Sequence, residues 1–217
     1  MVYKIRLNRL FSGFSYEVPE GKSTRLAQRV WLKLKENDFK LNDKQDILVV
    51  CFKDQENTSP RMPEYRDQKW IAEHIVDIQA EDLENLESNV TIVAEKLEEV
   101  LCTYISDPAD KQMIHEWVSD AAISGEHMEA VLKRRKYCGK TAVLSVRYLD
   151  NGEYLPIIRV YNAEEELAIK DILPCTKYLN VLEILEFKNK CVTVRSRKNY
   201  IKQQSYTVKC ESIFRKK

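Results

Sequence analysis

The longest amphipathic pattern in the chain runs from Leu83 to Tyr104. Apolar residues recur there at alternating spacings of three and four, which places them on one face of an α-helix. The residues of this apolar stripe are Leu83, Leu86, Val90, Val93, Leu97, Val100 and Tyr104. Glutamates fill several of the positions between them, so we predict a long helix with one apolar face and one acidic face.

The N-terminal pattern predicts a small mixed unit in residues 1–54. Apolar and polar residues alternate through much of residues 3–18, and a Ser-Gly pair in the middle permits a turn, so a β-hairpin is expected. A basic amphipathic helix should begin near Ser23. Residues 47–52 form a continuous apolar run, as expected of a strand buried on both faces. This ββαβ order resembles the start of β-grasp, ubiquitin-like folds, a resemblance of element order alone.

Residues 64–138 are predicted to be a helical bundle. A helix is expected over residues 65–78, followed by the long helix of the apolar stripe. Asp107 precedes Pro108, and this pair suits the N-cap and first turn of another helix. A short final helix is expected over residues 126–136, because its last four residues are cations that suit the negative end of a helix dipole.

From Thr141 onward the apolar pattern has a period of two, which predicts strands. Five strands are expected, over residues 143–148, 154–161, 179–187, 191–195 and 206–214. Asn151 and Gly152 lie between the first two and predict a hairpin, because both accept the positive φ of a type I′ turn. Residues 141–217 should therefore form an antiparallel β sheet or small barrel, which makes the chain an α+β protein.

The net charge of +1 over 217 residues hides a strong segregation of charge along the chain. Residues 54–107 carry fourteen Asp/Glu against four Lys/Arg, whereas residues 188–217 carry ten Lys/Arg against one Glu. No apolar run is long enough to span a bilayer, and the first ten residues do not have the pattern of a secretory signal. We expect a soluble intracellular protein, cytoplasmic or nuclear, with no membrane partner.

The basic C-terminus carries the preferred functional prediction. Its cations alternate with aromatic rings, as cations do where phosphates are bound and rings do where unpaired bases stack. The candidate residues are Arg195, Arg197, Lys198, Tyr200, Lys202, Tyr206, Lys209 and Arg215. We predict a non-enzymatic binding or assembly protein that contacts nucleic acid, with single strands or RNA favoured. The alternative is a protein–protein adaptor or structural subunit of a larger assembly, with the acidic helices and the basic ends as complementary docking surfaces. The basic strands could also simply have solvated outer faces, with the tail docked against the acidic helices.

The apolar stripe has two interpretations. It could pair with its copy in a second subunit, which would make the seven residues a dimer interface. Amphipathic helices of globular proteins more often face their own core, and neighbouring helices with Trp70 and Trp117 could cover the stripe. We expect a protein partner or self-association, and the seven residues of the stripe are the candidate interface.

A third functional prediction is a Mg²⁺-dependent nuclease. Asp171 lies upstream of Glu186 and Lys188, which end an apolar strand. The three resemble the D…E-x-K arrangement of metal-dependent nucleases, which implies carboxylate ligands in Asp171 and Glu186 and a catalytic cation in Lys188. The usual proline before the aspartate is absent, and alternating strand polarity accounts for the same residues.

Cysteine and histidine spacings predict no metal site. The six cysteines form no C-x-x-C pair, and no two histidines are four residues apart on a helix. The five glycines never cluster into a phosphate-binding loop. We therefore expect no cofactor, no bound metal outside the nuclease alternative, and no small-molecule substrate.

Overall fold

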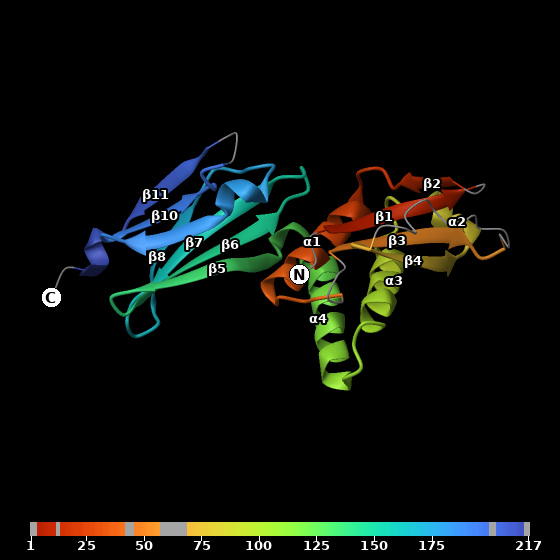
Figure 1. The fold of residues 1–217 in the computed structure, drawn as a ribbon, viewed down its shortest axis with the longest axis horizontal. Coiled ribbons are helices and arrows are strands. Elements are labelled where there is room, and N and C mark those ends of the chain that lie inside the picture. Colours follow the sequence, from red (N-terminus) through yellow and green to blue (C-terminus); the bar gives the residue numbers. More distant parts are fainter. Residues whose placement is uncertain (1–3, 12–13, 42–45, 57–68, 200–202, 215–217) are drawn as a thin grey trace. The chain divides into compact units, whose positions relative to one another are not determined.

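The computed structural model describes residues 4–11, 14–41, 46–56, 69–199 and 203–214 (Figure 1). The chain divides into two compact units, residues 1–128 (unit 1) and residues 129–217 (unit 2). Within the described residues it has four α-helices and eleven strands in three sheets, which confirms the α+β prediction. No helix in those ranges combines the length and apolar character needed to cross a membrane.

Unit 1 begins with the predicted ββαβ order. Its elements are β1 (Lys4–Phe11), β2 (Phe14–Glu17), α1 (Lys22–Glu36) and β3 (Ile47–Asp54), to which β4 (Ile71–Ile78) is added. The sheet order is β2-β1-β3-β4. β1 is antiparallel to β2 and parallel to β3, and β4 is parallel to β3. β3 is thus a central strand, which explains its continuous apolar sequence.

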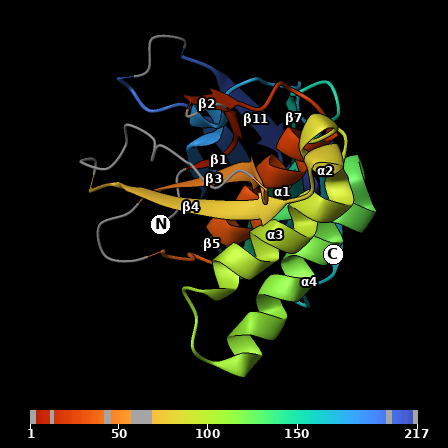
Figure 2. The same cartoon turned by 90° about the vertical axis from the view of Figure 1, so that its right-hand side faces the viewer.

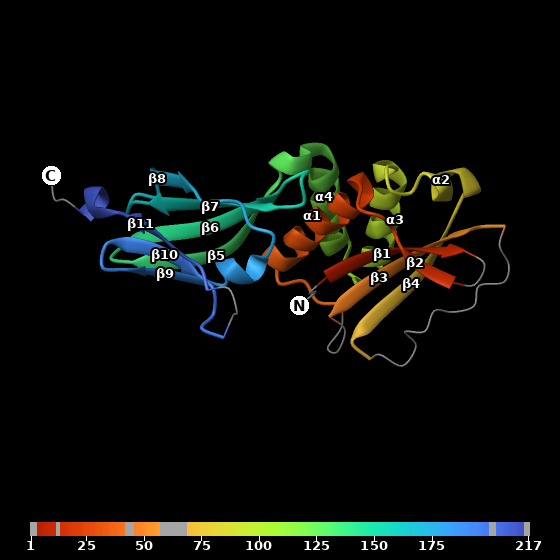
Figure 3. The same ribbon diagram turned by 90° about the horizontal axis from the view of Figure 1, so that it is seen from above.

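The helices α1, α3 (Val90–Cys102) and α4 (Pro108–Ser124) lie on one face of this sheet. After β4 the chain forms α2 (Ala80–Glu84), α3 and α4, and the 3-10 turn η2 (Gly125–His127) follows α4. Figures 2 and 3 show α1, α3 and α4 on the same side of the strands. Leu34 of α1, Leu97 of α3 and Ile114 of α4 are fully buried there, as is Phe52 of the sheet. One part of the core of unit 1 therefore lies between the sheet and these helices, and a smaller buried cluster, formed by Leu10, Val49, Cys51 and Ile71, lies on the other face of the sheet.

The helix predicted over residues 65–78 is wrong for its second half. Residues 71–78 form β4, and they pair along their whole length with β3. Ile71, Ile75 and Ile78 have the spacing of a helix face, but β-branched residues also suit strands. Pairing with β3, a tertiary contact that no local pattern reveals, decides the outcome.

The single long helix predicted over the apolar stripe is interrupted. α2 ends at Glu84, and α3 begins at Val90 after a turn. Asn89 caps α3, since its side chain accepts a hydrogen bond from the Ile92 amide at 3.3 Å. Residues of this type bond readily to nearby backbone and therefore favour helix ends over helix interiors. The predicted Asp107 cap is confirmed, because its carboxylate accepts from the Ala109 amide at 2.8 Å.

Unit 2 contains two antiparallel sheets. The four-stranded sheet has the order β5-β6-β7-β8, and the three-stranded sheet has the order β11-β10-β9. The strands are β5 (Glu129–Tyr137), β6 (Lys140–Tyr148), β7 (Tyr154–Tyr161), β8 (Leu167–Ile172), β9 (Ile184–Lys188), β10 (Cys191–Arg195) and β11 (Ser205–Lys209). Two 3-10 turns, η3 (Leu179–Leu182) and η4 (Glu211–Phe214), replace the ends of the strands predicted over residues 179–187 and 206–214. The described strands form no closed barrel.

The helix predicted over residues 126–136 is wrong, because this segment is largely β5. Cys138 and Gly139 have φ angles of +49° and +74°, which are those of a tight turn between antiparallel strands. Glycine after a run of cations also suits the end of a helix, so the local sequence fits both structures. β8 was not expected at all, and it follows a turn of three consecutive glutamates.

The predicted hairpin of β6 and β7 is confirmed, but its turn differs from type I′. Gly152 has a φ of +80°, whereas Asn151 is not among the residues with positive φ. The Gly152 amide donates to the Leu149 carbonyl at 3.1 Å, and the Leu149 amide donates to the Glu153 carbonyl at 2.9 Å. The connection is therefore a longer loop that needs only one left-handed residue, which glycine supplies.

Candidate nucleic-acid interface

The three-stranded sheet has one apolar face and one polar face. Val192 lies opposite Phe187 and Val208, and the next row, centred on Thr193, points to the other side. Buried residues form the inner face, namely Leu185, Phe187, Val192, Val194 and Val208. Polar residues dominate the side that we call the β9–β11 outer face, which includes Glu186, Lys188, Cys191, Thr193, Arg195, Thr207 and Lys209.

Three cations share the β9–β11 outer face with one acid. The predicted residues Arg195 and Lys209 lie there, together with Lys188. Glu186 lies between two of them, since its carboxylate contacts Lys188 Nζ at 2.8 Å and Arg195 Nη2 at 2.6 Å. Hydrogen bonds from Lys188 and Arg195 lower the pKa of Glu186 to about 2. The acid therefore stays charged near neutral pH, and the three cations keep a net excess of positive charge.

The hydroxyl groups of Thr193 and Thr207 lie between these cations. Their Oγ1 atoms are 3.3 Å apart across β10 and β11. Each hydroxyl both donates and accepts, so the pair adds neutral hydrogen-bonding groups to a cationic face.

Two other predicted cations lie beyond the end of β10. Arg197 Nη2 contacts a Glu183 carboxylate oxygen at 2.5 Å, and Lys198 is exposed. The Lys198 carbonyl accepts a hydrogen bond from Gln203 Nε2 at 2.7 Å, which ties the two sides of the connection together. The charge of Arg197 is thus partly compensated, whereas the side chain of Lys198 extends into solvent.

Among the predicted residues that the structure describes, the ring of Tyr206 does not share a face with Arg195 and Lys209. Tyr206 lies in the same row as Val194 of the inner face, and its hydroxyl donates to Gln204 Oε1 at 3.2 Å. Its ring is therefore on the side of the sheet opposite Arg195 and Lys209. The remaining predicted residues, Tyr200, Lys202 and Arg215, lie outside the described residues.

The residues of the nuclease prediction lie in different sheets. Asp171 is in β8, opposite Ile158, whereas Glu186 and Lys188 are in β9. Glu186 is already bonded to two cations. In the part of the chain that the structure describes, no group of three or more His, Cys, Asp or Glu side chains is placed to hold a metal ion. Nuclease activity stays a prediction.

The apolar stripe lies mostly inside unit 1. Its buried members are Leu83, Leu86, Val93, Leu97 and Val100, and the half-buried ones are Val90 and Tyr104. The Tyr104 hydroxyl lies 2.6 Å from His74 Nε2 of β4, so the end of the stripe also contacts the sheet. This placement agrees with the intramolecular interpretation, in which the stripe covers its own core.

Sequence reasoning missed a second polar face, on the four-stranded sheet. One row across it contains Arg134 of β5, Val143 of β6, Arg159 of β7 and Lys170 of β8. Residues that point to the same side form what we call the β5–β8 outer face, whose charged members are Glu129, Arg134, Lys136, Arg147, Arg159 and Lys170. The local sequence offers little signal for this face, because neither residues 129–137 nor residues 167–172 alternate regularly between polar and apolar residues.

A half-buried ion pair organises part of the β5–β8 outer face. The two terminal nitrogens of Arg159, Nη1 and Nη2, donate to the Glu129 carboxylate, Nη2 at 2.8 Å, and Ser145 Oγ also donates to it. Arg147 Nε lies 3.8 Å from the same group. Burial raises the pKa of Glu129, but the hydrogen bonds from Arg159 and Ser145 outweigh it and hold the pKa below its ordinary value.

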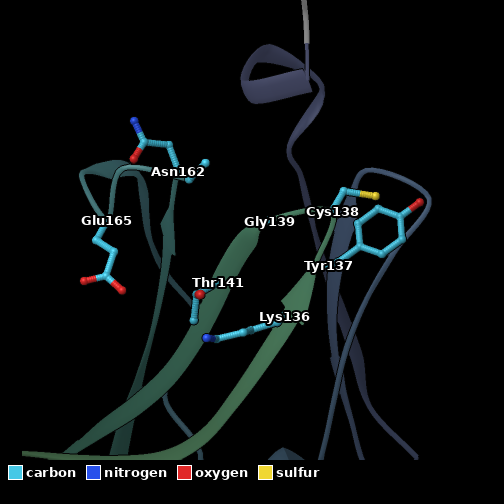
Figure 4. A pocket seen from close by; sticks show the side chains of 8 residues that line it. Lys136, Tyr137, Cys138, Gly139, Thr141, Asn162 and Glu165 are labelled. Atoms are coloured by element: carbon cyan, nitrogen blue, oxygen red, sulfur yellow. The ribbon is translucent and has the colours of Figure 1, made fainter.

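A hollow of about 300 Å³ lies at one end of this sheet, between two turns (Figure 4). It is lined by Lys136, Tyr137, Cys138, Gly139, Thr141, Asn162, Ala163 and Glu165. Figure 4 shows the ends of the Lys136 and Thr141 side chains close together, on neighbouring strands. Asn162 bonds within its own turn, because its Oδ1 accepts from the Glu166 amide at 2.8 Å. The hollow is polar, and its cation belongs to the β5–β8 outer face.

The boundary between the units is also a boundary of charge. Unit 1 contains 16 Lys/Arg and 24 Asp/Glu, a net charge of −8, and unit 2 contains 19 Lys/Arg and 10 Asp/Glu, a net charge of +9. A basic domain with its cations on sheet faces is the electrostatic pattern of a polyanion-binding module. No protein-family model, curated protein or solved structure matches the chain.

Proposed function

We propose that the protein binds nucleic acid through its phosphate groups, with the β9–β11 outer face of unit 2. The observation that carries the proposal is the grouping of Lys188, Arg195 and Lys209 on one face, with hydroxyl groups between them. Lysine, arginine and threonine side chains are common partners of phosphate oxygens. The net charge of +9 on unit 2 adds a long-range attraction to any polyanion.

The spacing of the cations favours a polymer over a single small anion. Lys188 and Lys209 lie on either side of Cys191 in one row, so two strand spacings, about 10 Å, separate their backbones. Arg195 is four residues farther along β10, about 13 Å from that row at the usual rise per residue. One phosphate group could not contact all three cations, whereas a chain of phosphates could.

The arrangement favours contact with the backbone over recognition of bases. Tyr206 lies on the other side of the sheet, away from Arg195 and Lys209. Phosphate contacts fix the position of a nucleic acid but do not identify its sequence. We therefore expect binding that depends strongly on salt and weakly on base sequence.

The test is a salt titration with a fluorescently labelled single-stranded RNA. Wild type should lose affinity steeply as salt rises, because bound cations replace condensed counterions. The Lys188→Gln, Lys209→Gln double variant should bind more weakly, and its plot of log affinity against log salt should be shallower by about 1.4, or about 0.7 per lost contact. Both side chains are exposed, so the substitutions should leave the fold intact.

Lys22→Gln is the matched control, because Lys22 is an exposed cation of unit 1. Like each substitution of the double variant, it removes one positive charge, but it lies in α1 and leaves the β9–β11 outer face unchanged. Its salt dependence should equal that of wild type. Absence of wild-type binding at low salt, or equal slopes for the double variant and wild type, would contradict the proposal.

A protein–protein adaptor is the second candidate, and the acidic surface of unit 1 supports it. Glu95 and Glu99 of α3 are exposed, and Glu98 is half-buried and lies 3.0 Å from His115 of α4. Such a surface suits a basic protein partner. The Glu95→Gln, Glu99→Gln double variant tests this, because it should weaken capture of a basic partner without altering the salt dependence of RNA binding.

A further inference from the structure

The β5–β8 outer face presents cations across the full width of its sheet. Arg134 and Lys170 belong to the first and last strands of the sheet and share one row with Arg159. Three strand spacings separate β5 from β8, about 14 Å. Lys136 lies in the neighbouring row, beside the hollow at the end of the sheet.

Most of this positive charge is not balanced on the same face. Glu129 is the acid there, and it pairs with Arg159. Three of the other cations, Arg134, Lys136 and Lys170, are exposed. With Arg147 included, five cations share the face with one acid.

The acids of the same sheet are concentrated elsewhere. Glu153 lies in the β6–β7 connection, and residues 164–166, all glutamate, lie in the β7–β8 turn. Solubility alone does not require an excess of one sign of charge on a surface, because a mixture of acidic and basic side chains is equally well solvated. Cations also lie on the opposite side of the same strands, at Lys133, Arg135 and Lys140, so the outer face is distinguished by its exposed cations and its single acid. Such an excess of cations on one face suits contact with phosphate groups.

The two cationic faces point away from a shared interior. Tyr137, on the opposite side of β5 from Lys136, packs against Phe187 of the three-stranded sheet at a ring distance of 5.5 Å. Phe214 packs against both rings, at 5.9 Å from Tyr137 and 6.1 Å from Phe187. The inner faces of both sheets therefore contribute to one core. On the β5–β8 outer face Val143, Ser145 and Ile157 are buried among their neighbours, and the exposed groups include Arg134, Lys136 and Lys170.

We infer that one molecule holds two nucleic-acid segments at the same time, one on each outer face of unit 2. The inference rests on the proposed function and adds a second site, formed by Arg134, Lys136 and Lys170, for the same phosphate chemistry. Because the two faces belong to different sheets, occupation of one does not block the other. The protein would then join strands or distant parts of one strand.

A bridging experiment tests this with two RNAs, one carrying biotin and one a fluorescent dye. Immobilised biotin-RNA should capture dye-RNA only when the full-length protein is present. The Arg134→Gln, Lys170→Gln double variant should still bind the dye-RNA in solution but should capture at least fivefold less of it. The Lys188→Gln, Lys209→Gln variant should show the same loss, since bridging needs both faces.

The outcomes separate the two claims. If wild type binds no RNA at low salt, the proposed function fails, and this inference fails with it. If wild type binds RNA but does not bridge, or if bridging survives Arg134→Gln, Lys170→Gln, then the second site is refuted while the proposed function stands. Bridging that survives Arg134→Gln, Lys170→Gln would indicate a dimer with one RNA site per subunit. Sedimentation of the protein alone would then show the dimer.

Discussion

At the scale of single residues, two acids of unit 2 lie among the cations of its outer faces. Glu186 on the β9–β11 outer face and Glu129 on the β5–β8 outer face each contact two cations. Their side chains are about equally exposed, 26% for Glu186 and 23% for Glu129. Glu129 also accepts a hydrogen bond from Ser145, so its cluster joins three strands, whereas Glu186 joins only β9 and β10. We therefore expect pairing to contribute more to folding at Glu129.

Glu129→Gln should destabilise the protein by about 1–3 kcal/mol at neutral pH, because it weakens charge-assisted hydrogen bonds in a mostly buried cluster. The folded-state pKa of Glu129 is lowered, so its stabilising contribution is complete above its unfolded pKa of about 4.3 and is lost as pH falls through the folded value. The difference in unfolding free energy between variant and wild type should accordingly shrink below about pH 4.

Urea denaturation across a pH series measures this difference. Glu164→Gln makes the same change at an exposed turn position and should alter stability by less than about 0.5 kcal/mol. A constant difference between Glu129→Gln and wild type from pH 7 to pH 3 would show that the carboxylate charge contributes nothing to folding.

Leu97→Ala tests whether the apolar stripe belongs to the core of unit 1. Leu97 is fully buried, so its truncation should cost about 2–5 kcal/mol in unfolding free energy. Ile123→Ala on α4 is the control, because Ile123 is 83% exposed and its loss should cost less than about 0.5 kcal/mol. If Leu97→Ala instead converted a dimer to a folded monomer of near-normal stability, the stripe would be a subunit interface.

At the scale of elements, local signals predicted local structure. The N-terminal ββαβ order, the Asp107-Pro108 start of α4 and the hairpin around Gly152 were all predicted, because each depends on a few adjacent residues. β4 and β5 were predicted as helices. Each has apolar or charged residues whose spacing fits a helix as well as a strand, and only the partner strand decides between them.

The same limit applies to the candidate interface. The sequence identified Arg195, Lys209 and Tyr206 as one group, but the β10–β11 register places Tyr206 on the opposite face from the two cations. A shift of one residue in that register would reverse the side of every β11 residue. The β5–β8 outer face was missed for a related reason, since it needs β5 and β8 to be strands.

Cys138→Asn should stabilise the β5–β6 turn by about 0.5 kcal/mol. Cys138 has a φ of +49°, and asparagine tolerates that conformation better than other residues with a side chain, especially before glycine. Thermal unfolding of the variant should show a higher Tm than wild type. Cys175→Asn, at an exposed position that is not among those with positive φ, should leave Tm unchanged, and an equal rise in both variants would refute the role of the turn.

At the scale of the whole molecule, the chain joins an acidic unit to a basic one. The net charges of −8 and +9 change sign at the boundary between residues 128 and 129, although the whole chain is nearly neutral. The net charge of the whole chain therefore conceals the basic character of unit 2, on which the proposed function rests. Under the proposed function, the acidic unit should repel nucleic acid, so we expect phosphate contacts on the outer faces of unit 2.

The most direct test of phosphate binding is to remove the acid from the β9–β11 outer face. Glu186→Gln frees Lys188 and Arg195 from their shared partner. We expect Glu186→Gln to bind labelled RNA more tightly than wild type at low salt, with a salt slope steeper by about 0.7. Glu116→Gln, which replaces an exposed acid on α4, makes the same change in net charge and should leave the slope as in wild type. Unchanged or weaker RNA binding by Glu186→Gln would contradict phosphate binding at this face, and loss of a Mg²⁺-dependent cleavage activity would support the nuclease alternative instead.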